Sequence, residues 1–342
     1  MSSSLLRPPS HLPPSTALEL SQQAPKIIKE APGAISTSTL QSLFSASETP
    51  ELWTIYENLL HSCLRTGDEE AAHQCLGRLI NRFGDENERV MALVGLLKEA
   101  DAQDNATLEV VLKEYEAILD RNPTNIPIVK RRVALLRSLG RVSDAVTALL
   151  SLLDFSPTDS EAWSELSDMY FSQGLYSQAI FALEEVLVLQ PNAWNIHARL
   201  GELLLMAAKS SQPNDAQRQL TEAVKRFCRS VELCDDYLRG FYGLKLVSLL
   251  ELLYYLTRRL IEYKATRKLL QEPPKAAKPS NDDDFPSPDA ATLRRLDELA
   301  TGKLAEITRR FAAGEKGWQG YDEAEIVAAK ALLEEEFGTV TR

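Results

Sequence analysis

The sequence has no long hydrophobic run. A membrane-spanning helix needs about 20 consecutive apolar residues, and the most apolar stretch, residues 244–256, is interrupted by Lys245 and Glu251. Residues 1–14 contain four prolines and no continuous apolar segment, so we expect no secretory signal. The sequence therefore predicts no direct membrane span.

Basic residues and cysteines are also scarce. The chain has 38 Lys and Arg against 49 Asp and Glu, a net charge of -11. Nucleic acids and anionic membrane surfaces are bound through a cationic face, so we expect no nucleic-acid partner. The four cysteines are Cys63, Cys75, Cys228 and Cys234, and no two of them form a CxxC pair. This pattern predicts reduced, buried thiols rather than a disulfide framework.

The sequence lacks the short motifs that mark common catalytic and cofactor sites. GxGxxG, GxxxxGK[ST], HExxH and GxSxG are all absent. His61 with Cys63 and His73 with Cys75 are the nearest approach to a metal site. Residues two apart on a helix lie about 200° apart around its axis, so neither pair converges on one ion. We expect no catalytic residue, no metal and no cofactor, and hence no enzyme.

What the sequence does contain is a repeat of 34 residues. Pro123, Pro157 and Pro191 are evenly spaced by this step, and two further pairs share it: Gly140 with Gly174, and Ala145 with Ala179. A period of 34 is typical of the tetratricopeptide (TPR) unit, a helix-turn-helix whose proline lies between one unit and the next. The period predicts an all-α, TPR-type helix-turn-helix solenoid.

Five repeats follow from this register: 53–86, 87–125, 126–159, 160–193 and a fifth that begins at Trp194. The second helix of the fifth repeat starts about ten residues late, and we expect a polar loop at residues 209–219 to absorb the insertion. A divergent sixth repeat is expected from residue 236.

Composition divides the chain into four parts. Residues 1–34 hold six of the 17 prolines and much serine, which predicts a disordered tail. The TPR solenoid is expected at residues 35–271. Residues 272–288 are rich in proline and aspartate and predict a disordered acidic linker. Residues 289–342 have two helical patterns, with Gly314 as the stop signal of the first, and we expect these helices to cap the solenoid.

Partner binding in such a solenoid is expected on the concave surface, at repeat positions 2, 5, 9 and 12 of each first helix. The candidate groove residues are Lys98, Lys130, Arg137, Ser164, Asp168, Phe171 and Glu202. They change from basic to acidic along the chain, which favours an oriented, extended peptide through complementary charge. Ordinary solvated side chains give the same pattern. The carboxylate clamp of co-chaperone TPR domains is not matched, because Ala134 and Glu165 stand where that clamp has asparagines.

Several short strings within residues 51–246 resemble one TPR family. They are Glu51-Leu52-Trp53, Ile55-Tyr56-Glu57, Asn122-Pro123-Thr124-Asn125, Lys130-Arg131-Arg132, Glu161-Ala162-Trp163, Glu165-Leu166 and the run from Phe181 to Val186. In order and spacing they are similar to the TPR-repeat subunits of the endoplasmic reticulum (ER) membrane protein complex.

This resemblance implies a non-catalytic scaffold, peripheral on the cytoplasmic face of the ER membrane. Such a subunit forms a hetero-oligomer, binding cytosolic segments of integral membrane subunits and another soluble subunit. The complex inserts transmembrane segments and tail anchors. The alternative is a general cytosolic TPR adaptor that binds an extended peptide in its concave groove.

Overall fold

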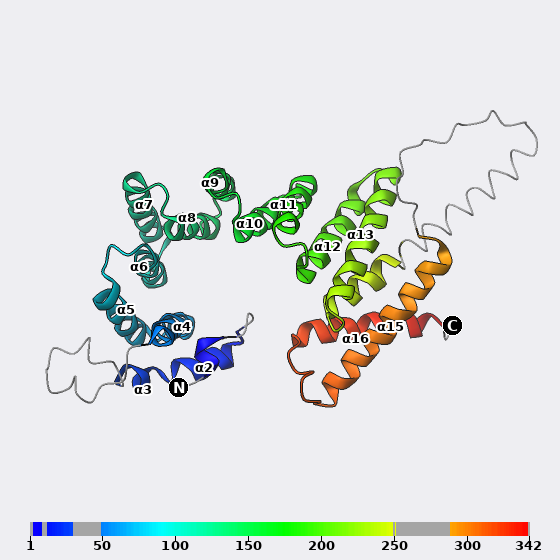
Figure 1. Ribbon diagram of the computed structural model, residues 1–342, viewed down its shortest axis with the longest axis horizontal. Helices are drawn as coiled ribbons and strands as arrows, with labels where there is room; N and C mark the ends of the chain where they lie inside the picture. Colours follow the sequence, from blue (N-terminus) through cyan, green and yellow to red (C-terminus); the bar gives the residue numbers. More distant parts are fainter. Residues whose placement is uncertain (1–2, 9–11, 30–48, 249, 251–287, 341–342) are drawn as a thin grey trace, which may run out of the picture. The chain divides into compact units, whose positions relative to one another are not determined.

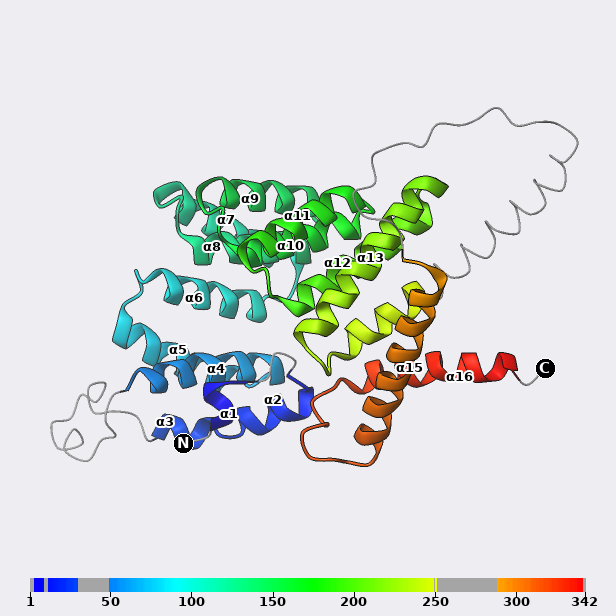
Figure 2. The ribbon, with the colours of Figure 1, turned by 45° about the vertical axis from the view of Figure 1, so that its right-hand side comes forward.

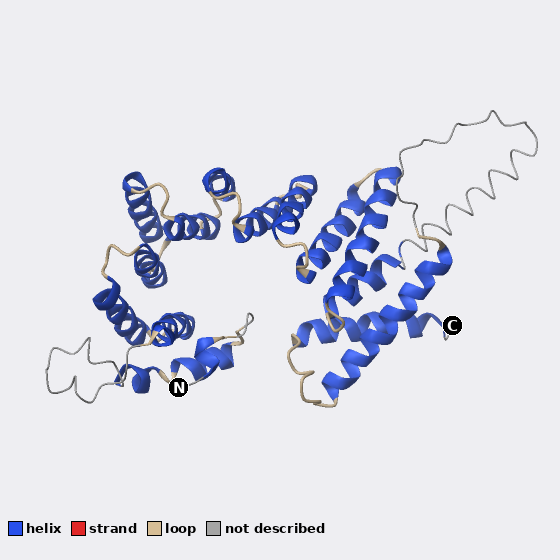
Figure 3. Ribbon diagram, viewed as in Figure 1, coloured by secondary structure: helices blue, strands red, loops and turns tan. Residues whose placement is uncertain are grey.

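The computed structural model describes residues 3–8, 12–29, 49–248, 250 and 288–340. In this part of the chain every regular element is a helix (Figure 3), which confirms the predicted all-α, TPR-type fold class. The chain divides into two compact units, Met1–Pro157 and Thr158–Arg342.

The first unit contains three helix pairs that coincide with the first three predicted repeats, as can be followed in Figure 1. The pairs are α4 Pro50–Thr66 with α5 Glu69–Phe83, α6 Glu88–Asp101 with α7 Asn105–Arg121, and α8 Ile126–Ser138 with α9 Val142–Phe155. Each pair is in contact internally, and α6 also contacts α8, the first helix of the next pair. This contact between successive first helices is the TPR stacking that the register predicts.

The residues that carry the 34-residue period perform two local tasks. Gly140 and Gly174 follow the first helices of their pairs with φ angles of 75° and 73°, a left-handed conformation that glycine adopts without strain. Ala145 and Ala179 are completely buried in the second helices. Their small side chains let the two helices of a pair approach closely.

The amino-terminal tail differs from the prediction. Residues 1–34 were expected to be disordered, whereas the described residues of this segment form α1 Ser3–Leu6, α2 Pro14–Ser21 and α3 Ala24–Lys29. Leu5, Leu20 and Ala24 are buried in the core of the first unit, and Asn58 Nδ2 donates a hydrogen bond of 2.7 Å to the carbonyl oxygen of Leu5.

The physical reason lies in α4. This helix is apolar on more than one face, because its buried residues include Leu52, Ile55, Tyr56 and Leu60, and α5 alone covers only one side of it. Helix α2 contacts the same helix (Figure 2) and removes a second apolar face from water.

A polar network ties the second repeat to the third. Tyr115 on α7 donates its hydroxyl to Glu99 on α6, and Arg131 Nε on α8 donates to the same carboxylate at 3.1 Å. The buried Tyr115 ring lies against Gly95, where a Cβ atom would come within 2.2 Å of the tyrosine oxygen. The network therefore requires glycine at position 95.

The second unit contains α10 Ser160–Ser172, α11 Tyr176–Leu189, α12 Trp194–Ser210, α13 Pro213–Leu233, a helical segment at 238–248, α15 Ala290–Ala312 and α16 Glu323–Val340. The expected loop at 209–219 was wrong, because α13 already begins at Pro213 and only residues 211–212 separate it from α12. Proline is well tolerated in the first turn of a helix, so the insertion lengthens the helices instead of the loop.

The two carboxy-terminal helices form where the sequence predicts them. Asp289 caps α15 by accepting a hydrogen bond from the Thr292 amide at 2.7 Å, and Gly314 follows that helix with a φ of 67°. Leu293, Leu304 and Ile326 are buried in one core with residues of α11, α12 and α13. The capping role remains a prediction. Residues 272–287 of the linker predicted at 272–288 lie outside the described residues, as do residues 30–48 and 251–271.

Lys245 joins segment 238–248 to α15 from inside this core. Its side chain is only 2% exposed, and its Nζ lies 3.2 Å from Asp297 Oδ1 and 2.8 Å from Thr301 Oγ1. A buried ammonium group is tolerated only with such partners. The charge that interrupts the apolar stretch in the sequence is thus part of the packing.

Replacing Leu20 by alanine should detach the amino-terminal helices. Leu20 is 2% exposed, and losing a buried leucine side chain costs about 2–5 kcal/mol. We expect amide hydrogen exchange in α2 to accelerate by at least about tenfold. Leu18→Ala, on the same helix but 49% exposed, is the control and should leave exchange unchanged. Equal exchange rates of α2 in the Leu20→Ala and Leu18→Ala variants would contradict the packing of α2 against α4.

Asp297→Ala should destabilise the protein by about 3 kcal/mol, because it leaves Lys245 buried without its carboxylate partner. Urea denaturation followed by circular dichroism measures this loss. The double variant Lys245→Met with Asp297→Ala removes both charges and should be more stable than the single variant. A double variant that is less stable would contradict the role of this pair.

Candidate partner-binding site

The three basic groove residues belong to the first unit, where they lie on α6 and α8. Lys98 on α6 is exposed, and its Nζ lies 2.5 Å from Glu114 Oε2 on α7. Lys130 is half-buried on α8, and Arg137 is exposed near the end of the same helix. Lys130 and Arg137 therefore lie on one helix, and Lys98 forms an ion pair within its own repeat.

The four groove residues of the second unit include three that meet at Arg199, a residue that the sequence analysis did not select. Arg199 Nη2 lies 3.1 Å from Asp168 Oδ1, and Nη1 lies 3.0 Å from Glu202 Oε2. Its guanidinium carbon is 4.9 Å from the centre of the Phe171 ring, within range of a cation–π contact. Ser164 is half-buried on α10.

Arg199 changes the electrostatics expected for this end of the groove. The sequence predicts an acidic surface from Asp168 and Glu202. One guanidinium group binds both carboxylates, so the three side chains together have a charge of about -1 rather than -2. The acidic character is reduced where it was predicted to be strongest.

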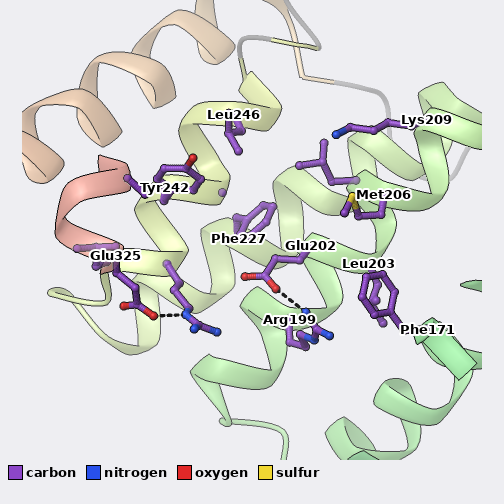
Figure 4. A pocket seen from close by; sticks show the side chains of 15 residues that line it. Phe171, Arg199, Glu202, Leu203, Met206, Lys209, Phe227, Tyr242, Leu246 and Glu325 are labelled. Atoms are coloured by element: carbon purple, nitrogen blue, oxygen red, sulfur yellow. Dashed lines mark hydrogen bonds and ion pairs between the residues drawn. The ribbon is translucent and has the colours of Figure 1, made fainter. Parts of the chain in front are cut away.

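Next to this cluster lies a pocket with a volume of about 400 Å³ (Figure 4). Its lining is mainly apolar and comes from α10, α12, α13, segment 238–248 and α16. The lining residues are Phe171, Arg199, Glu202, Leu203, Leu205, Met206, Lys209, Phe227, Leu238, Arg239, Tyr242, Gly243, Leu246, Glu325 and Ala328.

The position of Phe227 depends on two glycines. Its ring is fully buried and lies where a Cβ on Gly243 would approach to 2.0 Å and a Cβ on Gly201 to 2.9 Å. Glycine at both positions lets the flanking helices close around the ring. Because the flanking helices are so close to it, the Phe227 ring lies at the base of the pocket. Met206, 40% exposed, lies nearer the solvent.

The charged groups around the pocket are mostly paired. Arg199 binds Glu202, and Arg239 Nε lies 2.5 Å from Glu325 Oε1 on α16, as the dashed lines in Figure 4 show. Lys209 is exposed and makes no ion pair with any residue that the structure describes. One unpaired cation therefore stands beside an apolar cavity.

This arrangement is suited to binding an apolar group. Within the described ranges no three His, Cys, Asp or Glu side chains are placed to hold a metal ion.

Burial raises the pKa of Cys63 to about 11 and that of Cys75 to about 12, which makes both thiols unreactive. Cys228 and Cys234, expected to be buried, are partly exposed. No helix among the described residues is long and apolar enough for a bilayer.

Helical spacing could have identified part of this site. Arg199, Leu203 and Met206 follow one another at steps of four and three, so they share one face of α12 with Glu202. The rule of repeat positions 2, 5, 9 and 12 selected only Glu202 from that face. Glu325 had no such signal, because it lies 86 residues after its partner Arg239.

His197 fixes the beginning of α12, the helix that supplies six of the fifteen lining residues. It is 6% exposed, and its Nε2 lies 3.0 Å from the carbonyl oxygen of Pro191. Burial, reinforced by the positive charges of Arg226 and Arg229 on α13, lowers the pKa of His197 below its ordinary value of 6.5.

Comparison with known families gives a match at residues 77–217, to the model described as the EMC2 TPR-like repeat domain. The match runs from α5 to the start of α13 and includes both Asn122-Pro123-Thr124-Asn125 and Glu161-Ala162-Trp163. It confirms the family resemblance predicted from the sequence. Residues 77–217 of this chain are thus similar to the EMC2 TPR-like repeat domain.

Curated relatives are similar over the same region. The TPR repeat protein oca3 of Schizosaccharomyces pombe is 36% identical over 194 residues, which are 57% of this chain and 65% of oca3. The ER membrane protein complex subunit 2-A of Xenopus laevis is 30% identical over 198 residues, 58% of this chain and 63% of that protein. The matches thus span a little less than two thirds of these relatives.

Among solved structures, the C-terminal part of a TPR repeat-containing protein from Cytophaga hutchinsonii is 14% identical to this chain. That match covers 91% of this chain and 100% of the other, with a TM-score of 0.46.

The protein should lose stability as the pH falls below 6.5. The unfolded chain takes up the His197 proton at a higher pH than the folded chain, so the stability present above pH 6.5 is lost as the pH falls through the lower folded pKa. Urea midpoints between pH 7.5 and 5.0 measure this loss. The urea midpoint of the His197→Gln variant should fall less steeply with pH than that of the unchanged protein. Parallel curves for the two proteins would contradict the assignment of this loss to His197.

Proposed function

We propose that this chain, whose residues 77–217 match the EMC2 TPR-like repeat domain, is a non-catalytic scaffold subunit of the ER membrane protein complex. It acts at the cytoplasmic face of the ER membrane as a peripheral protein. There it holds integral membrane subunits through their cytosolic segments, together with another soluble subunit. The assembly inserts transmembrane segments and tail anchors.

The observation that carries this proposal is the apolar pocket beside the Arg199 cluster. A surface that exposes Met206 and has a cavity of about 400 Å³ is suited to a protein partner, since apolar anchors in pockets contribute most of the energy of protein interfaces. The absence of transmembrane helices from the described residues agrees with membrane attachment through partners. The similarity to relatives named as ER membrane protein complex subunits supports the choice of this complex.

The groove residues are proposed to contact these partners. Lys98, Lys130 and Arg137 supply basic contacts from the first unit. Ser164, Asp168, Phe171 and Glu202 supply polar and aromatic contacts from the second.

A general TPR adaptor is the second candidate, and the same pocket supports it. An adaptor binds one short peptide and needs no membrane proteins around it, whereas a complex subunit is recovered with several integral membrane proteins in fixed ratio. The composition of the purified assembly therefore separates the two functions.

The test is affinity purification of the tagged full-length chain from detergent-solubilised membranes. We expect several integral membrane proteins in stoichiometric amounts. The double variant Lys130→Glu with Arg137→Glu should recover markedly less of them, because it reverses two groove charges.

The matched control is Lys113→Glu with Arg121→Glu, two exposed cations on α7, which makes the same charge change on a second helix. It should recover the normal amount. Recovery of the chain without any integral membrane protein would refute the complex assignment. Equal recovery by both double variants would refute the role of Lys130 and Arg137.

A further inference from the structure

The pocket in the second unit is not built by repeat helices alone. Helix α12 contributes Leu203, Met206 and Lys209, and segment 238–248 contributes Tyr242 and Leu246. A further wall comes from α16, through Glu325 and Ala328. Helix α16 lies outside the 34-residue repeats, so the pocket includes residues from the carboxy-terminal helices as well as from the repeats.

Three contacts hold this wall in place. Arg239 pairs with Glu325 at the edge of the pocket. Just before α16, the Tyr321 hydroxyl donates to the carbonyl oxygen of Asp236 at 2.9 Å. On α15, Lys303 Nζ lies 3.0 Å from Asp236 Oδ1. Together they connect the carboxy-terminal helices to the start of segment 238–248. Because these contacts are within the chain, α16 is held at the pocket without a bound partner.

The size of the pocket limits what it can hold. A volume of about 400 Å³ lies at the lower end of the range of roughly 300–1,000 Å³ that is usual for ligand pockets. It has room for one large apolar side chain and the atoms next to it. An occupant attached to a longer chain could extend from the open side across α12.

The charges at the rim indicate what should lie beside that side chain. Arg199 and Arg239 are balanced by Glu202 and Glu325, while Lys209 is exposed on α12 without an ion pair in the described part of the chain. An occupant with a carboxylate near its apolar anchor gains a favourable contact there. An occupant with a basic residue at that place meets a like charge.

We propose that this pocket, formed jointly by α12, segment 238–248 and α16, binds one large apolar side chain of an extended partner segment that carries an Asp or Glu beside it. The inference rests on the proposed function for the existence of protein partners, and it assigns them a sequence preference. Met206 and Tyr242 contact the anchor, and Lys209 contacts the carboxylate.

The test uses the full-length chain and fluorescein-labelled ten-residue peptides in a Gly/Ser background. One central position carries Leu or Ser, and Asp or Lys is placed at each of the three positions on either side. Fluorescence polarisation measures binding. We expect a Leu peptide with a neighbouring Asp to bind best, and replacing its Leu by Ser should weaken binding about tenfold or more, the effect of losing one anchor residue.

Two variants test the pocket itself. Met206→Asp should weaken the Leu–Asp peptide about tenfold, whereas Val327→Asp, an exposed apolar position of α16 outside the lining, should not. Lys209→Glu should reverse the preference, so that Leu–Lys peptides bind better than Leu–Asp peptides. Lys330→Glu makes the same charge change on the exposed surface of α16 and should leave the preference as it is.

Equal binding of Leu and Ser peptides, or an unchanged preference in Lys209→Glu, would overturn the inference. Binding of dodecanoate in place of every peptide would overturn it as well, because the occupant would then be an acyl chain. These failures are distinct from failure of the proposed function. If membrane proteins still co-purify with Met206→Asp and Lys209→Glu in normal amounts, the scaffold function stands without this pocket.

Discussion

Close approach of helices at residues with little or no side chain is the constraint on which this structure depends. Ala145 and Ala179 are fully buried where the two helices of their pairs meet, and larger side chains would separate those helices. In the second unit the same constraint has a different form, since Gly201 and Gly243 make room for the ring of Phe227. The repeat period and the base of the pocket are consequences of one packing requirement.

The sequence predicts well what is local or periodic. Helix ends follow from glycine and capping residues, and Asn125 accepts from the Ile128 amide at the start of α8, where the repeat was expected to begin. The predicted pairs and the carboxy-terminal helices follow from the same kind of signal. The amino-terminal tail was missed because its prolines dominate its composition, although Pro14 lies in the first turn of α2, where proline is tolerated. The sequence did contain a signal for these helices, namely the second apolar face of α4, which another element has to cover.

The site was harder to predict because its residues come together from distant parts of the chain. Phe171, Asp168 and Glu202 were found from their repeat positions. Arg199 binds two of them, but it occupies repeat position 6, which is not among the positions 2, 5, 9 and 12 that were selected. Arg239 and Glu325 are 86 residues apart. Lys245 and Asp297 are 52 apart, so Lys245 could be seen only as an interruption of an apolar stretch. A single sequence contains no signal that pairs such residues.

The composite origin of the pocket links binding to the stability of the second unit. A groove made only of repeat helices would persist as long as its own repeats were folded. Here one wall is α16, whose position depends on the ion pair between Arg239 and Glu325 and on the Tyr321 contact to Asp236. A partner bound in this pocket as proposed would add contacts to that wall and thereby stabilise the folded carboxy-terminal helices. The proposed scaffold function would gain from this coupling, because occupancy of the pocket and order of the carboxy-terminal helices would then rise together.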